Sequence, residues 1–118
     1  MILVDTSVWI DHLRLGEEEL ERLLGEGRVL SHPFVIGELA CGNLRNRAEI
    51  LGLLSALPTA STASHAEVLR LVDDRVLAGK GLGWIDVHLL ASALVTKCPL
   101  WTKDKALRAA AGALDAGT

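Results

Sequence analysis

Four acidic side chains stand inside apolar stretches of the sequence, where an unpaired charge is costly to bury. Asp5 follows "MILV", Glu38 lies within "FVIGELACG", Asp86 lies within "GWIDVHLLASALV", and Asp104 ends "PLWTKD". Taken singly, Asp5 and Asp104 are typical helix caps, and Asp86 is typical of a first helical turn, where the helix dipole favours a carboxylate. Glu38 has no such explanation, because it falls in the interior of an expected helix.

The chemistry open to these acids depends on whether they meet. Crowded carboxylates repel one another, and the usual remedy in proteins is a hard divalent cation with oxygen ligands, Mg²⁺ or Mn²⁺. If the fold gathers the four acids, the sequence predicts a metal site. Histidines are not part of this prediction: His12, His32 and His65 lack metal-ligand spacing, and His88 is expected on another side of its helix from Asp86.

A parallel sheet covered by helices would bring the acids to one edge. Short apolar strands are expected at 2–4, 28–32 and 99–102, and "TAS" (59–61) is a candidate for another. Helices are expected at 7–15, 17–27, 33–43, 48–57, from the Ser64 cap to about 77, 84–96 and 103–113. This alternation predicts an α/β fold with a parallel sheet. Functional crevices of such sheets lie beyond the carboxyl ends of the strands, where Asp5 and Asp104 are expected.

Composition sets further limits. The 118 residues predict a single domain, 1–118, and with one Phe and no Tyr its core is expected to be aliphatic. The net charge of −3 argues against coating nucleic acid through bulk charge, although a local basic site stays open. Cys41 and Cys98 are expected to be reduced and buried. No apolar run approaches the ~18 residues of a membrane helix, so a cytoplasmic protein is expected.

The ordered set "ILVDTSVWI", "GEL", "IDVHLLASAL" and "LWTKD" resembles the PIN-domain family, and particularly the VapC toxins of bacterial toxin–antitoxin pairs. The resemblance runs through nearly the whole chain. It implies a compact three-layer α/β/α sandwich with a short central parallel sheet, and Mg²⁺- or Mn²⁺-dependent endoribonuclease activity. The chain departs from many relatives at 105–107, "KAL", where they carry a further acid. That departure bears on a second metal rather than the first.

The resemblance also assigns roles to individual residues. The catalytic and metal-binding acids would be Asp5, Glu38, Asp86 and Asp104, with Glu38 either a ligand or the base that deprotonates the attacking water. The supporting hydroxyls would be those of Ser7 and Thr102, together with Thr6. Cations near the expected site are candidates for RNA phosphate contacts; they are Arg45, Arg47, Lys103, Lys105 and Arg108.

Partners follow from the same resemblance. It implies an RNA substrate, tRNA or rRNA being the expected class, and a small VapB-like antitoxin with a basic tail that covers the acidic site. It further implies a homodimer, and a heterotetramer or larger assembly with the antitoxin. The amphipathic helices around 9–24 are the candidates for the antitoxin groove. Trp9, Trp84 and Trp101 could stack on bases, but their apolar neighbours favour core or dimer contacts.

Two other interpretations stay open on the residues alone. In a non-catalytic binding module the acids would serve only as helix caps and partner contacts, with no metal binding. In a haloacid dehalogenase-like phosphatase Asp5 would be the nucleophile, but that chemistry wants a second acid two residues later, where Ser7 stands.

Overall fold

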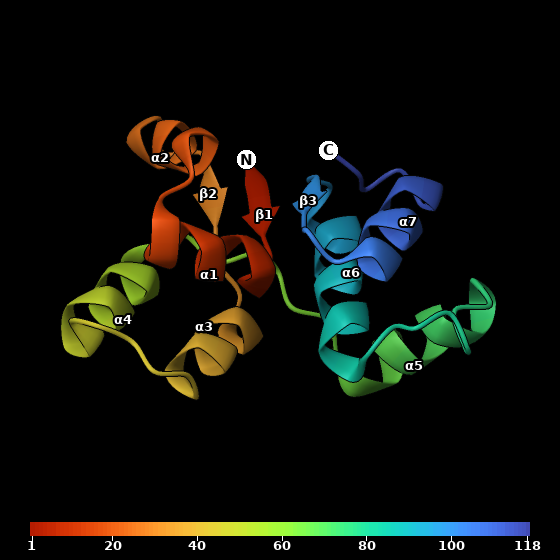
Figure 1. Ribbon diagram of the computed structural model, residues 1–118. Helices are drawn as coiled ribbons and strands as arrows, with labels where there is room; N and C mark the ends of the chain where they lie inside the picture. Colours follow the sequence, from red (N-terminus) through yellow and green to blue (C-terminus); the bar gives the residue numbers. More distant parts are fainter.

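The computed structural model describes residues 1–118 and places a short parallel sheet at the centre of the molecule (Figure 1). Strand β1 (Ile2–Val4) lies between β2 (Val29–Leu30) and β3 (Leu100–Trp101). Both neighbours run parallel to β1, and Val4 is paired with Trp101. Because β1 is the central strand, its carboxyl end opens at the middle of the sheet's edge.

Seven helices surround the sheet. In chain order they are α1 (Thr6–Leu15), α2 (Glu18–Gly25), α3 (Pro33–Ala40), α4 (Arg47–Ala56), α5 (His65–Asp74), α6 (Trp84–Thr96) and α7 (Lys105–Ala113). Figure 1 shows α1 to α4 on one side of the strands and α5 to α7 on the other, with both chain ends near the sheet. Helices on both sides of a short parallel sheet confirm the predicted α/β class.

The core is aliphatic, as the composition predicts. Leu3 and Val4 of β1 are fully buried, and so are Leu89 and Leu90 of α6. A strand that is buried on both faces must end where a polar group can again be satisfied. Strand β1 therefore delivers the next residue, Asp5, to the edge of the core.

Several helix ends differ from prediction for local reasons. Helix α5 stops at Asp74 instead of about 77, because Val76 takes a left-handed conformation with φ 52° that no helix tolerates. Helix α3 ends at Ala40 rather than 43. Helix α7 begins at Lys105, since Asp104 is its N-cap rather than its second residue.

Two weaker predictions are also corrected or refined. The candidate strand 59–61 is reduced to a single parallel bridge between Ser31 and Thr59. Cys98 is buried, but Cys41 is exposed, contrary to expectation; both thiols are free. None of the helices is both long enough and apolar enough to span a bilayer.

The residues after α7 return to the sheet. The Leu100 backbone N–H in β3 donates a 2.7 Å hydrogen bond to the Ala116 carbonyl, and the Ala116 side chain is buried. The segment adds no strand, but it covers the outer edge of β3.

Candidate active site

Asp5 stands at the carboxyl end of β1 and is only 5 % exposed. Its backbone N–H donates to the Trp101 carbonyl at 2.9 Å, which ties it to β3. Its Oδ2 accepts hydrogen bonds of 2.7 Å from both the Ser7 and the Thr102 hydroxyls, and a longer one from the Ser7 backbone N–H that caps α1. Hydroxyl donors of this kind satisfy a buried carboxylate and fix its orientation.

The two hydroxyls also hold the segment that carries Asp104. Ser7 Oγ accepts from the Lys103 backbone N–H at 3.0 Å, and Thr102 Oγ1 accepts from the Asp104 backbone N–H at 3.1 Å. The turn from β3 into α7 is therefore fastened to the first residues of α1. Asp104 itself caps α7, since its Oδ2 accepts from the Leu107 backbone N–H at 2.9 Å.

Glu38 reaches this edge from α3. Its Oε1 accepts a 2.7 Å hydrogen bond from the Thr6 hydroxyl, and Thr6 directly follows Asp5 in the chain. The Glu38 side chain is exposed to solvent, which explains how a charge is tolerated in an otherwise apolar helix. Thr6 is thus the hydroxyl that orients Glu38, whereas Ser7 and Thr102 orient Asp5.

Asp86 completes the group from the first turn of α6. Its Oδ2 accepts from the Gly83 backbone N–H at 2.8 Å. Burial raises the pKa of Asp86 above its ordinary value, the Gly83 hydrogen bond opposes that rise, and the negative charges of Asp104 and Asp5 add to it. Asp86 therefore lies within electrostatic reach of both aspartates, which come from opposite ends of the sequence.

One pattern is common to all four acids. Each uses a single carboxylate oxygen for protein hydrogen bonds and leaves the other without a protein donor; the bonded oxygens are Asp5 Oδ2, Glu38 Oε1, Asp86 Oδ2 and Asp104 Oδ2. A structural role for each acid is therefore compatible with a shared ligand site, because the hydrogen bonds within the protein use only one oxygen of each carboxylate. The other oxygen of each carboxylate is left for a ligand.

These oxygens suit a hard cation. An all-oxygen donor set favours Mg²⁺ or Mn²⁺ over zinc. No three His, Cys, Asp or Glu side chains stand close enough to hold one ion directly. Mg²⁺ keeps several of its waters and is usually bound through one or two carboxylates, so binding here would involve at most two of the acids directly.

The predicted RNA-contacting cations fall into two groups. The Lys103 ammonium lies 2.8 Å from Asp11 and 2.7 Å from Glu17, and its pKa is raised mainly by these hydrogen bonds. The Arg47 guanidinium donates to the Ala40 and Gly42 carbonyls at the end of α3. By contrast, no side-chain hydrogen bond or ion pair occupies the three remaining cations, Arg45, Lys105 and Arg108.

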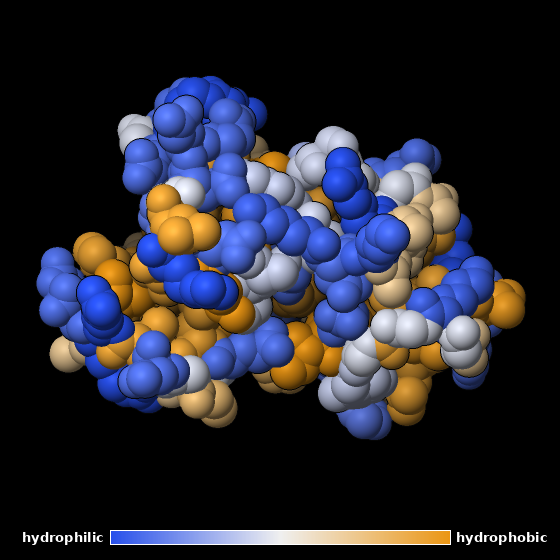
Figure 2. Space-filling model, viewed as in Figure 1, coloured by the Kyte–Doolittle hydropathy of each residue, from blue (hydrophilic) through white to orange (hydrophobic).

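Glu38 and Arg45 also line a groove of about 680 Å³ between α1, α3 and α4. Its apolar wall includes Ile10, Leu13 and Leu15, and Leu15 is 85 % exposed. Figure 2 shows hydrophobic surface gathered over these helices beneath the polar helix α2. Helix α1 lines this groove and α2 does not, so only part of the 9–24 region expected to bind the antitoxin borders it.

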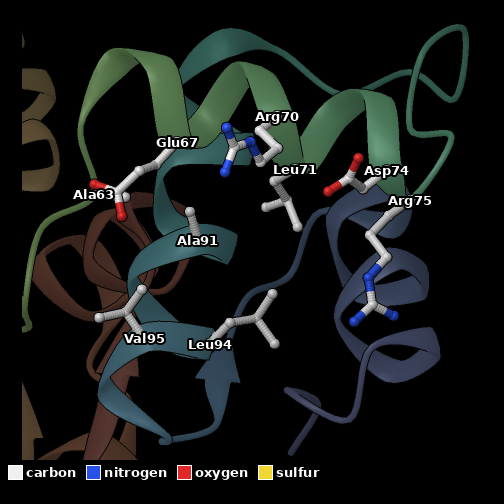
Figure 3. Close-up of a pocket in the computed structure, with 9 residues that line it drawn as sticks. All are labelled: Ala63, Glu67, Arg70, Leu71, Asp74, Arg75, Ala91, Leu94 and Val95. Carbon is white, nitrogen blue, oxygen red and sulfur yellow. The ribbon is translucent and has the colours of Figure 1, made fainter.

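A smaller hollow of about 340 Å³ lies between α5 and α6 (Figure 3). Leu71, Ala91 and Leu94 form its floor, and Arg70 and Arg75 stand at its margin. None of the four acids lines it, so it is separate from the acidic edge.

The parallel sheet and the acids at its carboxyl edge define a PIN domain. The PIN-domain family model matches residues 2–113, and the chain belongs to this family. It is 52 % identical, over 93 % of its length and 90 % of theirs, to the protein named Ribonuclease VapC32 in two strains of Mycobacterium tuberculosis, CDC 1551 / Oshkosh and ATCC 25618 / H37Rv. The family resemblance seen in the sequence motifs is thereby confirmed.

Sequence reasoning missed two contributors to the site. The Gly83 N–H orients Asp86, and the pattern of Gly followed three residues later by Asp at a helix start is a capping signal that was present in the sequence. The bridge from Lys103 to Asp11 and Glu17 has no such signal. Those residues are 92 and 86 positions from Lys103, and only the fold brings them together.

Proposed function

We propose that this chain is the ribonuclease toxin of a VapBC toxin–antitoxin pair, a Mg²⁺- or Mn²⁺-dependent endoribonuclease that cleaves tRNA or rRNA and so inhibits translation. The observation that carries the proposal is the set of four carboxylates from β1, α3, α6 and the β3–α7 turn, each with one oxygen free. The relatives named as ribonucleases support it.

Asp5, Asp86 and Asp104 would hold the cation, at least one of them through water, since no three acids stand close enough to bind it directly. Such an ion, when bound, supplies charge neutralisation at the scissile phosphate and a nucleophilic water at neutral pH. The protein's own part begins with Ser7 and Thr102, which fix Asp5 Oδ2 and so aim its free Oδ1 at the ligand. Preorganised groups of this kind lose little free energy to reorganisation during reaction.

Glu38 has a different role in this proposal. Thr6 holds its Oε1, while Oε2 stays free and solvent-accessible. A carboxylate oriented in this way can accept a proton from the attacking water, or share the cation. Arg45, Lys105 and Arg108, whose charges no acid of this chain neutralises, would contact backbone phosphates on either side of the cut bond.

The antitoxin would cover the same edge. Its apolar segment would occupy the groove between α1, α3 and α4, and its basic tail would reach the acids past Glu38, which lines both places. An Arg from that tail can form a bidentate pair with a free carboxylate. We also propose a homodimer that binds the antitoxin as a heterotetramer or larger assembly in the cytoplasm.

The decisive experiment is cleavage of total bacterial RNA by purified protein with Mn²⁺ or Mg²⁺, with chelator, and by Asp5→Asn. Asn keeps an oxygen for Ser7 and Thr102 but loses the charge, so the fold should survive while cleavage is lost. Asp73→Asn is the matched control, because Asp73 is exposed and its side chain bonds nothing. Discrete fragments with parent and control only, abolished by chelator, support the proposal.

Two results would overturn it. If Asp5→Asn cleaves RNA at the parent rate, Asp5 has no part in the reaction. If the parent protein neither cleaves RNA nor binds Mn²⁺ in calorimetry, the chain is the non-catalytic binding module, in which the acids serve only as helix caps and partner contacts.

A further inference from the structure

A row of four rings crosses the molecule next to the acidic edge. Phe34 of α3 packs edge-on against His88 of α6 with ring centroids 4.7 Å apart, and His88 packs edge-on against Trp84 at 4.6 Å. Trp84 in turn lies 5.0 Å from His65 at the start of α5. We call Phe34, His88, Trp84 and His65 the aromatic row. It joins three helices that share no other aromatic contact.

The row is held rigidly from below. His32, the N-cap of α3, lies 5.3 Å from the Phe34 ring, and its Nδ1 accepts from the Phe34 backbone N–H at 3.0 Å. Because Nδ1 is an acceptor, the ring proton is on Nε2, which donates to Ser92 of α6 at 3.0 Å. His88 is buried at 7 % exposure between the two flanking rings. Phe34 and Trp84 are therefore fixed in place before any ligand arrives.

Both flanking rings are open to solvent. Phe34 is 36 % exposed and Trp84 is 40 % exposed, so Trp84 is not the core residue that was one of its two expected roles. The chain has one Phe, three Trp and no Tyr, so two of its four such rings are spent on this surface. Neither ring belongs to the buried core, in which Trp9 is the one aromatic residue. Phe34 and Trp84 cover His88 with one part of each ring and leave the rest open to a ligand.

The position of the row indicates which ligand. Phe34 lies one helical turn before Glu38 on the same side of α3. Trp84 begins α6, whose first turn also holds Asp86, although their two-residue separation directs the two side chains to different sides of the helix. The Phe34 end of the row therefore lies beside Glu38. The acids repel a phosphate backbone wherever no cation neutralises them, and the row carries no acidic group. A substrate crossing this border gains most by turning its bases toward the rings.

We propose that Phe34 and Trp84 form a stacking platform for unpaired bases next to the bond that is cut. This inference rests on the proposed ribonuclease function and deepens it, because it assigns the two residues that hold the bases beside the bond that is cut. Aromatic faces stack on any base, and imidazole nitrogens of the row add hydrogen-bonding groups at its centre and end. Phe34 and Trp84 are positioning residues that hold the strand and take no part in the proton transfers.

The test measures binding apart from cleavage. In an Asp5→Asn background, the dissociation constant of a labelled mixed-sequence 12-nucleotide RNA is measured by anisotropy, as a single strand and as a duplex. Phe34→Leu and Trp84→Leu keep apolar bulk but remove the π-face. Each should weaken single-strand binding by about 5- to 100-fold, as expected for one lost base stack, and should leave the weaker duplex binding unchanged. Trp84→Phe should restore most of the affinity.

Two further readouts separate this role from a structural one. With Asp5 intact, Phe34→Leu and Trp84→Leu should raise KM for cleavage of that RNA much more than they lower kcat. Leu53→Ala on α4 is the control, because Leu53 is 61 % exposed and lies outside the row. It should change neither quantity.

The inference can fail while the ribonuclease stands. If both Leu variants bind and cleave like the parent, the platform does not exist, and Asp5→Asn still tests the reaction independently. If Trp84→Leu instead shifts the sedimentation of the free protein to a smaller species at unchanged RNA affinity, the row is an interface between two copies. Either result overturns the proposal.

Discussion

Thr102 and Asp5 are 97 positions apart in the sequence, and a 2.7 Å hydrogen bond joins the hydroxyl of one to the carboxylate of the other. The bond crosses from β3 to β1 and uses the same oxygen of Asp5 that Ser7 holds. It orients the most buried of the four acids and leaves Asp5 Oδ1 without a protein donor. The geometry of the candidate site therefore depends on a residue outside the set of four acids.

Replacing Thr102 by Val removes this hydroxyl while keeping the branched shape of the side chain. We expect Mn²⁺ affinity and RNA cleavage to fall by about 10- to 100-fold, as for other residues that orient metal ligands. Thr102→Ser should recover most of the loss. Thr62→Val, at an exposed position, is the control. Unchanged Mn²⁺ affinity by calorimetry in Thr102→Val would show that Asp5 does not need this bond.

Removing a charge from the acidic edge should stabilise the protein when no metal is present. Asp86 is the informative position, because its pKa is raised by burial and further by Asp104 and Asp5. We expect Asp86→Asn to have a higher Tm than the parent in chelator. Mn²⁺ should then raise the parent's Tm but barely move that of the variant. Equal Mn²⁺-induced shifts in both proteins would argue against Asp86 as a ligand.

His32 should make the protein less stable in mild acid. Burial, with a smaller contribution from the charge of His88, lowers the pKa of His32 from 6.5 to about 4. In the unfolded chain His32 is therefore protonated near pH 6.5, whereas in the folded protein it is protonated only near pH 4. The contribution of neutral His32 to the free energy of unfolding is fully present above pH 6.5. It is lost as the pH falls from 6.5 to about 4, and the loss is at most about 3 kcal/mol.

Urea unfolding at a series of pH values measures this loss. His32→Asn should be less stable than the parent at pH 7, because it disrupts the bond to Ser92, but its stability should vary less between pH 6.5 and 4. His65→Gln, at an exposed histidine, should keep the parent's slope. A parent slope that survives in His32→Asn would assign the acid sensitivity to other groups.

Lys103 should contribute less to RNA binding than the cations around it. Its ammonium is already paired with Asp11 and Glu17, whereas Lys105 and Arg108 have no such partners. In an Asp5→Asn background, Lys105→Gln and Arg108→Gln should each lower the salt dependence of single-strand binding by about 0.7 in log–log slope. Lys103→Gln should leave the slope unchanged. A larger change for Lys103→Gln would mean that RNA displaces its two acids.

The sequence alone predicts the elements whose signals are local. Helix α6 begins and ends where its apolar pattern and the glycine-rich turn before it indicate, at Trp84 and Thr96. Strand β1 is equally clear, since its apolar run ends at a charge. The predicted end of α5 at about 77 is wrong because Val76 adopts a left-handed backbone conformation, which valine rarely takes. A backbone conformation imposed by packing cannot be predicted from the residue type.

The candidate site divides in the same way. Its acids could be found because each conflicts with its apolar surroundings. Helix caps could be anticipated at Asp5 and Asp104, and a first-turn position at Asp86. The sequence could not show that each acid is able to serve both a structural role and metal binding. The structure shows this, because one oxygen of each acid is hydrogen-bonded within the protein and the other is free. The sequence also could not separate Lys103 and Arg47, whose charges are used within the protein, from Lys105 and Arg108.

The hydrogen bond from Leu100 to Ala116 makes the last few residues a support for β3. β3 is two residues long, and past its end come Thr102 and Asp104. Its inner edge is hydrogen-bonded to β1, and the residues after α7 hold its outer edge. A purification tag fused to Thr118, two residues beyond Ala116, would load the bond from Leu100 to Ala116. We therefore expect a tag at this end to lower the rate of RNA cleavage relative to the untagged protein.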